Sequence, residues 1–145
     1  MNDAYKTINQ TLVGLFNEIM ELEEKALTGS SFTDLTNNDM HVIEAIGLEE
    51  GNNMSKIAKK LNITVGSLTT AMNSLVNKKY VVRKRSEVDR RVVYVKLTEK
   101  GIQAFLHHEE YHKKMTEAIL EKLSEEEIPV LVKTLDALTD FFNAY

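Results

Sequence analysis

Apolar residues recur at intervals of three and four along most of the chain, which predicts a largely helical protein. A first helix is predicted over residues 5–27, and a second begins at Asn37, where Thr36 and Asp39 have the spacing of a capping box. The second helix is expected to extend through the segment 37–50. The apolar residues that recur in the first segment are Ile8, Leu12, Leu15, Phe16, Ile19 and Leu22, and the predicted inner face of the second helix is Met40, Ile43 and Ile46 with Ala45.

Two shorter amphipathic segments follow, separated by the three residues Asn-Ile-Thr at 62–64. Thr64 is a suitable N-cap for the second segment. Two short helices joined by a tight turn have the geometry of a helix-turn-helix. Their predicted inner positions are Ile57, Ala58 and Leu61, and then Val65, Leu68, Met72, Leu75 and Val76.

Beyond this pair the pattern changes from helical spacing to alternation. Segments 80–85 and 90–97 are rich in valine and tyrosine, which predicts two strands joined at Ser-Glu-Val-Asp (86–89). Thr98 is expected to cap a helix over 99–121, and Ser124 with Glu127 forms a capping box for a final helix. The predicted order is helix, helix, helix-turn-helix, hairpin, helix, helix.

Composition excludes several classes of protein. The chain has 145 residues, enough for one domain with a core, and no cysteine, so disulfides and thiolate metal sites are ruled out. It contains no apolar run of the ~20 residues that a membrane span needs and no secretory signal pattern, so a cytoplasmic protein without a membrane partner is expected. The sequence shows no P-loop, glycine-rich nucleotide loop or nucleophile elbow, which argues against an enzyme.

The net charge of −4 hides an asymmetry. Residues 54–100 contain twelve Lys and Arg against three acids, whereas the rest of the chain contains six Lys against nineteen acids. All four arginines lie between positions 83 and 91. A basic middle between acidic ends indicates binding to a polyanion. The alternative is an excess of lysine on a solvated face.

The outward face of the second short helix is small, polar and uncharged. Such a face fits a DNA major groove, where Asn, Ser and Thr bind base edges and a helix N-terminus favours phosphate. An ordinary exposed face would more often contain Glu and Lys. The predicted residues at this helix are Thr64, Gly66, Ser67, Thr69, Thr70 and Asn73.

The hairpin supplies the arginines. We expect Arg83, Lys84 and Arg85 to contact phosphates, and Arg90 and Arg91 to enter a narrow A·T-rich minor groove near the hairpin tip. Asp89 is close enough in sequence to brace one of the tip arginines. The alternative is a set of surface salt bridges without a partner.

The stretch Asp-Arg-Arg-Val-Val-Tyr-Val-Lys-Leu-Thr-Glu-Lys-Gly (89–101) resembles the wing signature of the MarR family of regulators, and the helix order fits over essentially the whole chain. The resemblance implies a mainly α, winged helix-turn-helix fold with a two-stranded β-wing, forming a homodimer on palindromic DNA. It implies one domain over 1–145, with dimerisation helices in 1–30 and 102–145 and a DNA-binding lobe over 36–100. It also places Arg91 in the minor groove. Lys79 stands where the family usually has glycine, which puts the end of the recognition helix in doubt.

Two long stretches, 8–47 and 65–93, resemble the FabT-type branch of this family, which represses fatty-acid synthesis genes. This implies a repressor whose DNA binding is strengthened by acyl chains on acyl carrier protein, with no cofactor. The alternative effector is another small ligand. The residues that could line an acyl tunnel, or could equally be ordinary core, are Phe16, Ile19, Met20, Met40, Ile43, Phe105 and Met115.

The four histidines offer a further alternative. His108 and His112 are four residues apart on one predicted helical face, a spacing that can hold a metal ion, and His41 is on a helix expected to pack nearby. Zinc-sensing members of the MarR family use a comparable arrangement, so a zinc-responsive repressor of metal uptake genes remains open. Without metal, His41 would form an interhelical hydrogen bond.

Overall fold

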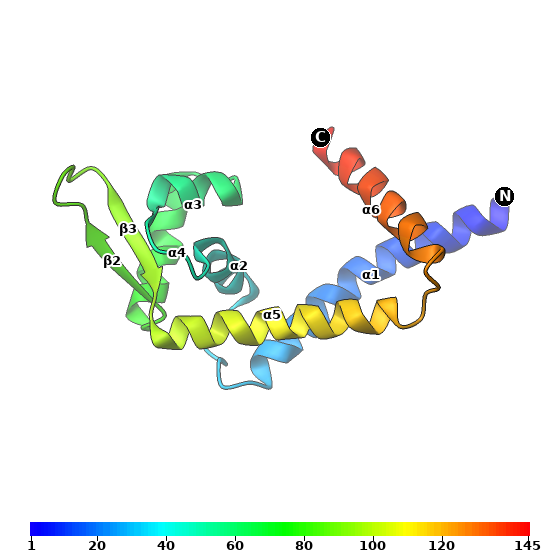
Figure 1. The fold of residues 1–145 in the computed structure, drawn as a ribbon, viewed down its shortest axis with the longest axis horizontal. Helices are drawn as coiled ribbons and strands as arrows, with labels where there is room; N and C mark the ends of the chain where they lie inside the picture. Colours follow the sequence, from blue (N-terminus) through cyan, green and yellow to red (C-terminus); the bar gives the residue numbers. More distant parts are fainter. The chain divides into compact units, whose positions relative to one another are not determined.

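The computed structural model describes residues 1–145, except the side chain of residue 28, and divides them into two compact units, Met1–His108 and Glu109–Tyr145. Six helices and three short strands account for most of the described chain (Figure 1). The helices are α1 (Asn2–Thr28), α2 (Asn37–Ile46), α3 (Met54–Leu61), α4 (Val65–Asn77), α5 (Glu99–Leu120) and α6 (Glu127–Asn143). The strands are β1 (Asn52–Asn53), β2 (Val81–Arg85) and β3 (Val93–Leu97).

The core of the first unit lies among α2, α3 and α4, which pack against one another and against the sheet. Most of the predicted inner positions of these helices are buried, which confirms the helical pattern. Val65 is the exception, because its side chain is 47% exposed. The buried members of the predicted set are Met40, Ile43, Ile46, Ile57, Ala58, Leu68, Met72 and Leu75.

The start of α2 is the predicted capping box. The Thr36 hydroxyl accepts a hydrogen bond from the Asp39 amide at 3.1 Å, and the Asp39 carboxylate accepts one from the Thr36 amide at 3.0 Å. The helix ends at Ile46, earlier than the predicted segment 37–50, because Gly47 adopts a φ of +64° that a helix cannot continue.

The turn between α3 and α4 follows the helix-turn-helix prediction. Asn62 adopts the left-handed region with φ 53°, where asparagine is better tolerated than most residues, and so ends α3. Thr64 then caps α4, its hydroxyl accepting a hydrogen bond from the Ser67 amide at 3.1 Å. The turn therefore fixes the direction in which α4 leaves α3.

The end of α4 resolves the doubt about Lys79. This lysine adopts the left-handed conformation itself, with φ 69°. The Tyr80 amide donates to the Leu75 carbonyl and the Lys79 amide to the Val76 carbonyl, both at 3.0 Å, the pair of bonds that defines a Schellman motif. The helix thus ends as it would with glycine, at a conformational cost of about 1–2 kcal/mol for the lysine.

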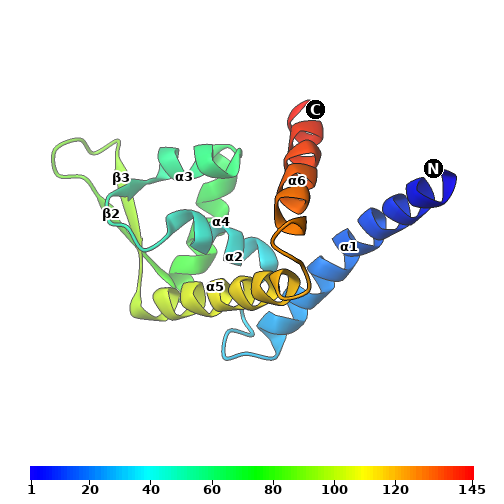
Figure 2. The ribbon, with the colours of Figure 1, turned by 45° about the vertical axis from the view of Figure 1, so that its right-hand side comes forward.

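The wing is a hairpin of β2 and β3, with Val81 opposite Leu97 and Arg85 opposite Val93 (Figure 2). Val95 and Leu97 point into the core as the alternation predicted. Two details differ from the prediction. The connecting loop runs over residues 86–92, longer than the predicted turn at 86–89, and β1 adds a third strand that pairs Asn52 with Val95.

The junction between wing and α5 explains the Leu-Thr-Glu-Lys-Gly stretch. The Thr98 hydroxyl donates to the Lys79 carbonyl at 2.7 Å and accepts from the Gly101 amide at 3.1 Å, which confirms it as the cap of α5. A Cβ atom at Gly101 would lie only 2.1 Å from the Tyr80 carbonyl oxygen. Glycine at this position therefore allows α5 to pack against the backbone at the end of α4.

Tyr80 is fully buried beside this junction. Its hydroxyl donates to the Asp34 carboxylate at 2.6 Å, and the Lys100 ammonium lies 4.3 Å from the centre of its ring. Burial and the bond to Asp34 raise the pKa of the Tyr80 hydroxyl well above its ordinary value. Lys78, the C-cap of α4, binds Asp39 at 3.0 Å, so the end of α4 is tied to the start of α2.

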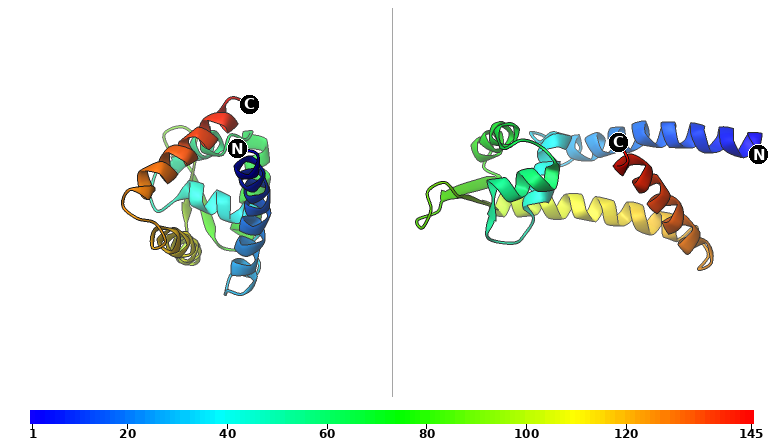
Figure 3. Two further views of the ribbon diagram at one scale, coloured as in Figure 1. Left: turned by 90° about the vertical axis from the view of Figure 1, so that its right-hand side faces the viewer. Right: turned by 90° about the horizontal axis from the view of Figure 1, so that it is seen from above.

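The second unit contains the C-terminal part of α5 and α6 (Figure 3). Ser124 and Glu127 exchange the two predicted capping bonds, at 2.9 and 3.3 Å, but α6 begins only at Glu127, with Glu126 as its N-cap. Pro129 is the third residue of α6, within the first turn, where its missing N–H costs no intrahelical bond. The apolar side chains of Val130, Leu135, Phe141 and Phe142 are exposed on α6.

No helix in the described part of the chain is long and apolar enough to cross a membrane.

Candidate nucleic-acid interface

The face of α4 that points away from the core consists of small polar residues. Gly66, Ser67, Thr70 and Asn73 are exposed and Thr69 is half-buried, as the helical pattern predicted. The Thr69 hydroxyl donates to the Val65 carbonyl at 2.8 Å. The Thr64 hydroxyl donates to the Ser67 hydroxyl at 3.0 Å. Most of these side chains are short, so a nucleic acid can approach the helix backbone closely.

The predicted inner stripe of α4 needs one correction. Val65 is the first residue of α4 and does not face the core, whereas Leu68 in the same turn is fully buried. Its side chain instead lines a hollow between α4 and the wing. An exposed valine next to Thr69 offers methyl groups of the kind that contact the methyl group of thymine.

The strand β2 presents its basic residues on both faces of the sheet. Arg83 and Arg85 line the hollow on the α4 side, whereas Lys84 lies with Val82 on the other face. Within the first face, Arg83 Nη1 donates to Asn73 Oδ1 at 2.6 Å, which links the wing strand to α4. The sequence indicated both residues as DNA contacts but not that they touch each other.

The tip of the wing contains the predicted brace. Arg91 Nε donates to Asp89 Oδ1 at 3.1 Å and Arg91 Nη2 to Asp89 Oδ2 at 3.2 Å, while the Arg91 side chain remains 91% exposed. These bonds hold the pKa of the Asp89 carboxyl below its usual value. Ser86 supports the loop by accepting from the Asp89 amide at 3.2 Å. Arg90 is also exposed.

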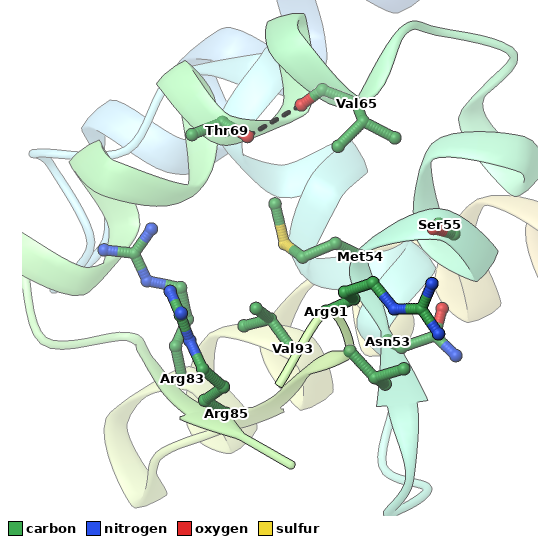
Figure 4. Close-up of a pocket in the computed structure, with 10 residues that line it drawn as sticks. Asn53, Met54, Ser55, Val65, Thr69, Arg83, Arg85, Arg91 and Val93 are labelled. Atoms are coloured by element: carbon green, nitrogen blue, oxygen red, sulfur yellow. Dashed lines mark hydrogen bonds between the residues drawn. The ribbon is translucent and has the colours of Figure 1, made fainter. Parts of the chain in front are cut away.

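A hollow of about 380 Å³ lies between α4, the start of α3 and the wing (Figure 4). Met54 and Val93 lie at its centre, and Val65 and Thr69 line one side. Arg83 and Arg85 lie together on another side, and Arg91 lies opposite them with Asn53 and Ser55. Its three lining arginines give it a positive charge that suits a polyanion such as DNA. Six of its lining residues were not among the DNA contacts predicted from the sequence: Asn53, Met54, Ser55, Val65, Val92 and Val93. Asn53 at the N-cap of α3 had the residue type expected of a cap, a local signal that does not indicate a place beside the wing.

The residues suggested for an acyl tunnel do not form one described pocket. Met40 and Ile43 are buried core, and Phe105 packs against that core. Phe16, Ile19 and Met20 are exposed on α1, whereas Met115 belongs to the second unit. The ligand site therefore stays a prediction.

The histidines occupy different surroundings. His108 is buried, with Nε2 3.6 Å from the Glu44 carboxylate, and Glu23 is buried with a carboxylate oxygen within 4.8 Å of a His108 ring nitrogen. His41 is exposed and lines a hollow with Leu61 and Ser67, and no hydrogen bond to it is among those that the structure describes. His112 lies in the second unit. A metal role for the predicted set stays a hypothesis.

Comparison with known proteins identifies relatives of this chain. Residues 28–108 match the family model described as transcriptional regulator SarA/Rot. The HTH-type transcriptional regulator PchR of Bacillus subtilis is 32% identical over 94% of the chain and 79% of its own length.

Solved structures show the same fold. The crystal structure of Streptococcus pneumoniae FabT in complex with DNA superimposes with a TM-score of 0.90, at 41% identity over 97% of this chain and 98% of that one. Adhesin competence repressor (AdcR) from Streptococcus pyogenes gives a TM-score of 0.72 at 25% identity, covering 92% of this chain and 96% of that one. The matches identify a DNA-binding transcriptional regulator rather than an enzyme, and confirm the winged-helix prediction.

Proposed function

This chain belongs to the MarR family of winged-helix transcriptional regulators, and we propose that it represses genes of fatty-acid synthesis under the control of acyl chains carried by acyl carrier protein. The observation that carries the proposal is the 41% identity to FabT over 97% of the chain. The stretches 8–47 and 65–93 of the sequence also resemble FabT-type repressors. The identity extends beyond the winged core, since it spans nearly all of both chains.

The reading of DNA is assigned to α4 and the wing. Ser67 and Thr70 meet base edges in the major groove beside Asn73, with Gly66 allowing close approach of the helix backbone. Arg91, held by Asp89, enters the adjacent minor groove together with Arg90. An arginine whose guanidinium group is already oriented loses less side-chain entropy when it enters a narrow groove.

We propose that two copies bind a palindromic operator. A two-fold axis would place two α4 helices in successive major grooves, with half-sites about one helical turn apart. The exposed apolar side chains of Ile8, Phe16 and Ile19 on α1 support this assembly, as does the exposed apolar face of α6, because a second copy would remove them from water.

The acyl effector is tested by measuring operator affinity. Duplexes selected by the protein from a random-sequence library would be titrated alone, with acyl carrier protein bearing a long acyl chain, and with unacylated carrier protein. The proposal predicts tighter DNA binding only with the acylated carrier. An unchanged affinity would overturn the acyl proposal while leaving the DNA-binding function intact.

A divalent metal ion is the second candidate effector, favoured by the buried Glu23, His108 and nearby Glu44. The same titration with zinc and with a chelator separates the two candidates. A zinc-dependent change in operator affinity that is lost in His108→Ala would favour a metal-responsive regulator. A response to the acylated carrier that is unaffected by chelator would exclude metal control.

A further inference from the structure

We propose that Arg83 is a base-reading residue that recognises guanine in the major groove, and that Asn73 is the residue that positions it. The proposal rests on the assignment of the outward face of α4 to DNA. It departs from the expectation that Arg83 binds phosphate and that Asn73 reads a base alone. The contact that carries it is the 2.6 Å bond from Arg83 Nη1 to Asn73 Oδ1.

The orientation of the Asn73 amide follows from its partner. A guanidinium can only donate hydrogen bonds, so the group that faces it must be the amide oxygen. The oxygen is thus engaged by Arg83. Bidentate recognition of adenine uses both the oxygen and the amino group of an asparagine side chain. Asn73 therefore contributes less as an independent reader of adenine than its position alone would indicate.

The position of Arg83 follows from the same bond. Asn73 lies on the outward stripe of α4 that also contains Gly66 and Thr70, at spacings of four and three residues. Its bond to Arg83 brings the guanidinium from strand β2 to this stripe, at the surface that enters the groove. An arginine bound only to phosphate would have no need of a partner on the reading face of the helix.

The free edge of the guanidinium matches a guanine. Nη1 is engaged by Asn73, and no bond to Nε or Nη2 is among those the described residues make. These two nitrogens donate in parallel, the geometry that fits guanine O6 and N7, and arginine–guanine is the commonest specific contact in the major groove.

The chemistry of the partner distinguishes this arginine from the one at the wing tip. Arg91 is braced by a carboxylate, whose negative charge offsets part of its own. Asn73 is neutral, so Arg83 keeps its full charge while its orientation is fixed. Arg83, proposed for the major groove, is thus held by a neutral amide, and Arg91, proposed for the minor groove, is held by a carboxylate.

The test compares base preferences selected from a library of duplexes with a randomised central segment. Wild-type protein, Arg83→Ala, Arg83→Lys and Asn73→Ala would each be used for selection, followed by affinity measurements on single base-pair variants of the selected site. We expect wild type to require a G·C pair at one symmetric position in each half-site. Arg83→Ala should reduce affinity for that site by about 5- to 150-fold and remove the preference at that position.

The positioning role has its own readout. Asn73→Ala should weaken the preference at the same base pair as Arg83→Ala, with an unchanged dependence of affinity on salt. Arg83→Lys keeps the charge but lacks the planar fork, so it should not restore full guanine preference. Lys84→Ala serves as the charge-matched control from the opposite face of the sheet, and should lower affinity equally for all sequences without altering any preference.

Three results would overturn the proposal. The first is a uniform loss of affinity in Arg83→Ala, with a salt slope reduced by about one and base preferences retained, which identifies a phosphate contact. The second is a change in Asn73→Ala at a different base pair from that in Arg83→Ala, which identifies asparagine as an independent reader. The third is the absence of any sequence selected by wild type, which would also refute sequence-specific DNA binding.

Discussion

Replacement of Lys79 by glycine should stabilise the protein, because this lysine occupies a backbone conformation that favours glycine. Its φ of 69° is fixed by the two Schellman bonds at the end of α4, both 3.0 Å long. A non-glycine residue in this region costs about 1–2 kcal/mol. Glycine also loses more backbone entropy on folding, about 0.4–1 kcal/mol, which offsets part of the gain.

The net expectation for Lys79→Gly is therefore an increase of about 1 kcal/mol in the free energy of unfolding. For a chain of this length that corresponds to about 2–4 °C in Tm. The assay is urea unfolding followed by circular dichroism at one fixed protein concentration, because association in the native state would make stability concentration-dependent.

Lys79→Ala is the matched control. It removes the same charge and side chain but keeps the conformational cost, so its stability should stay within about 0.5 kcal/mol of wild type. Equal stabilisation in both variants would show that charge repulsion, and not the left-handed backbone, opposes the lysine. No stabilisation in Lys79→Gly would refute the conformational argument.

Three further variants test other parts of the structure. Gly101→Ala should destabilise the fold by about 2 kcal/mol or more in urea unfolding, because its Cβ would meet the Tyr80 carbonyl at 2.1 Å; a neutral result would show that α5 can move away at no cost. Tyr80→Phe should cost about 1–3 kcal/mol in the same assay, since the buried hydroxyl donates to the charged Asp34; unchanged stability would contradict that bond. Asp89→Asn should lower the ratio of affinities for A·T-flanked over G·C-flanked duplexes in anisotropy titrations, because Arg91 loses its charged brace, and an unchanged ratio would refute the brace. The pKa of Asp89 is lowered in the folded state, so its bond to Arg91 is present above the ordinary carboxyl pKa and is lost only as the pH falls through the lowered value. The wild-type ratio of affinities for A·T-flanked over G·C-flanked duplexes should therefore be constant through neutral pH.

Local signals in the sequence predicted the local structure well. The capping boxes at Thr36 and Ser124 formed as predicted because each needs only residues three positions apart. The brace between Asp89 and Arg91 was predictable for the same reason, as the two are separated by one residue. Helical spacing likewise identified most of the core of α2, α3 and α4, but not the buried Val42 and Met54.

Features that depend on tertiary packing were missed or misplaced. Strand β1 has two residues and exists only through its pairing with β3, some forty residues later, so no local pattern indicates it. The exposure of Val65 depends on where the wing lies relative to α4. The contact of Arg83 with Asn73 depends on the same arrangement, which is why the sequence suggested two separate DNA contacts instead of one pair.

We propose that α4 and the basic wing bind DNA through the arginines of residues 83–91. The most direct test is the affinity of wild type and Arg91→Ala for a selected duplex with A·T-rich flanks, measured by fluorescence anisotropy from about 50 to 200 mM salt. The wild-type affinity should fall steeply as salt rises, and Arg91→Ala should bind more weakly with a flatter salt dependence. An affinity of Arg91→Ala equal to that of wild type at every salt concentration would show that Arg91 does not contact DNA.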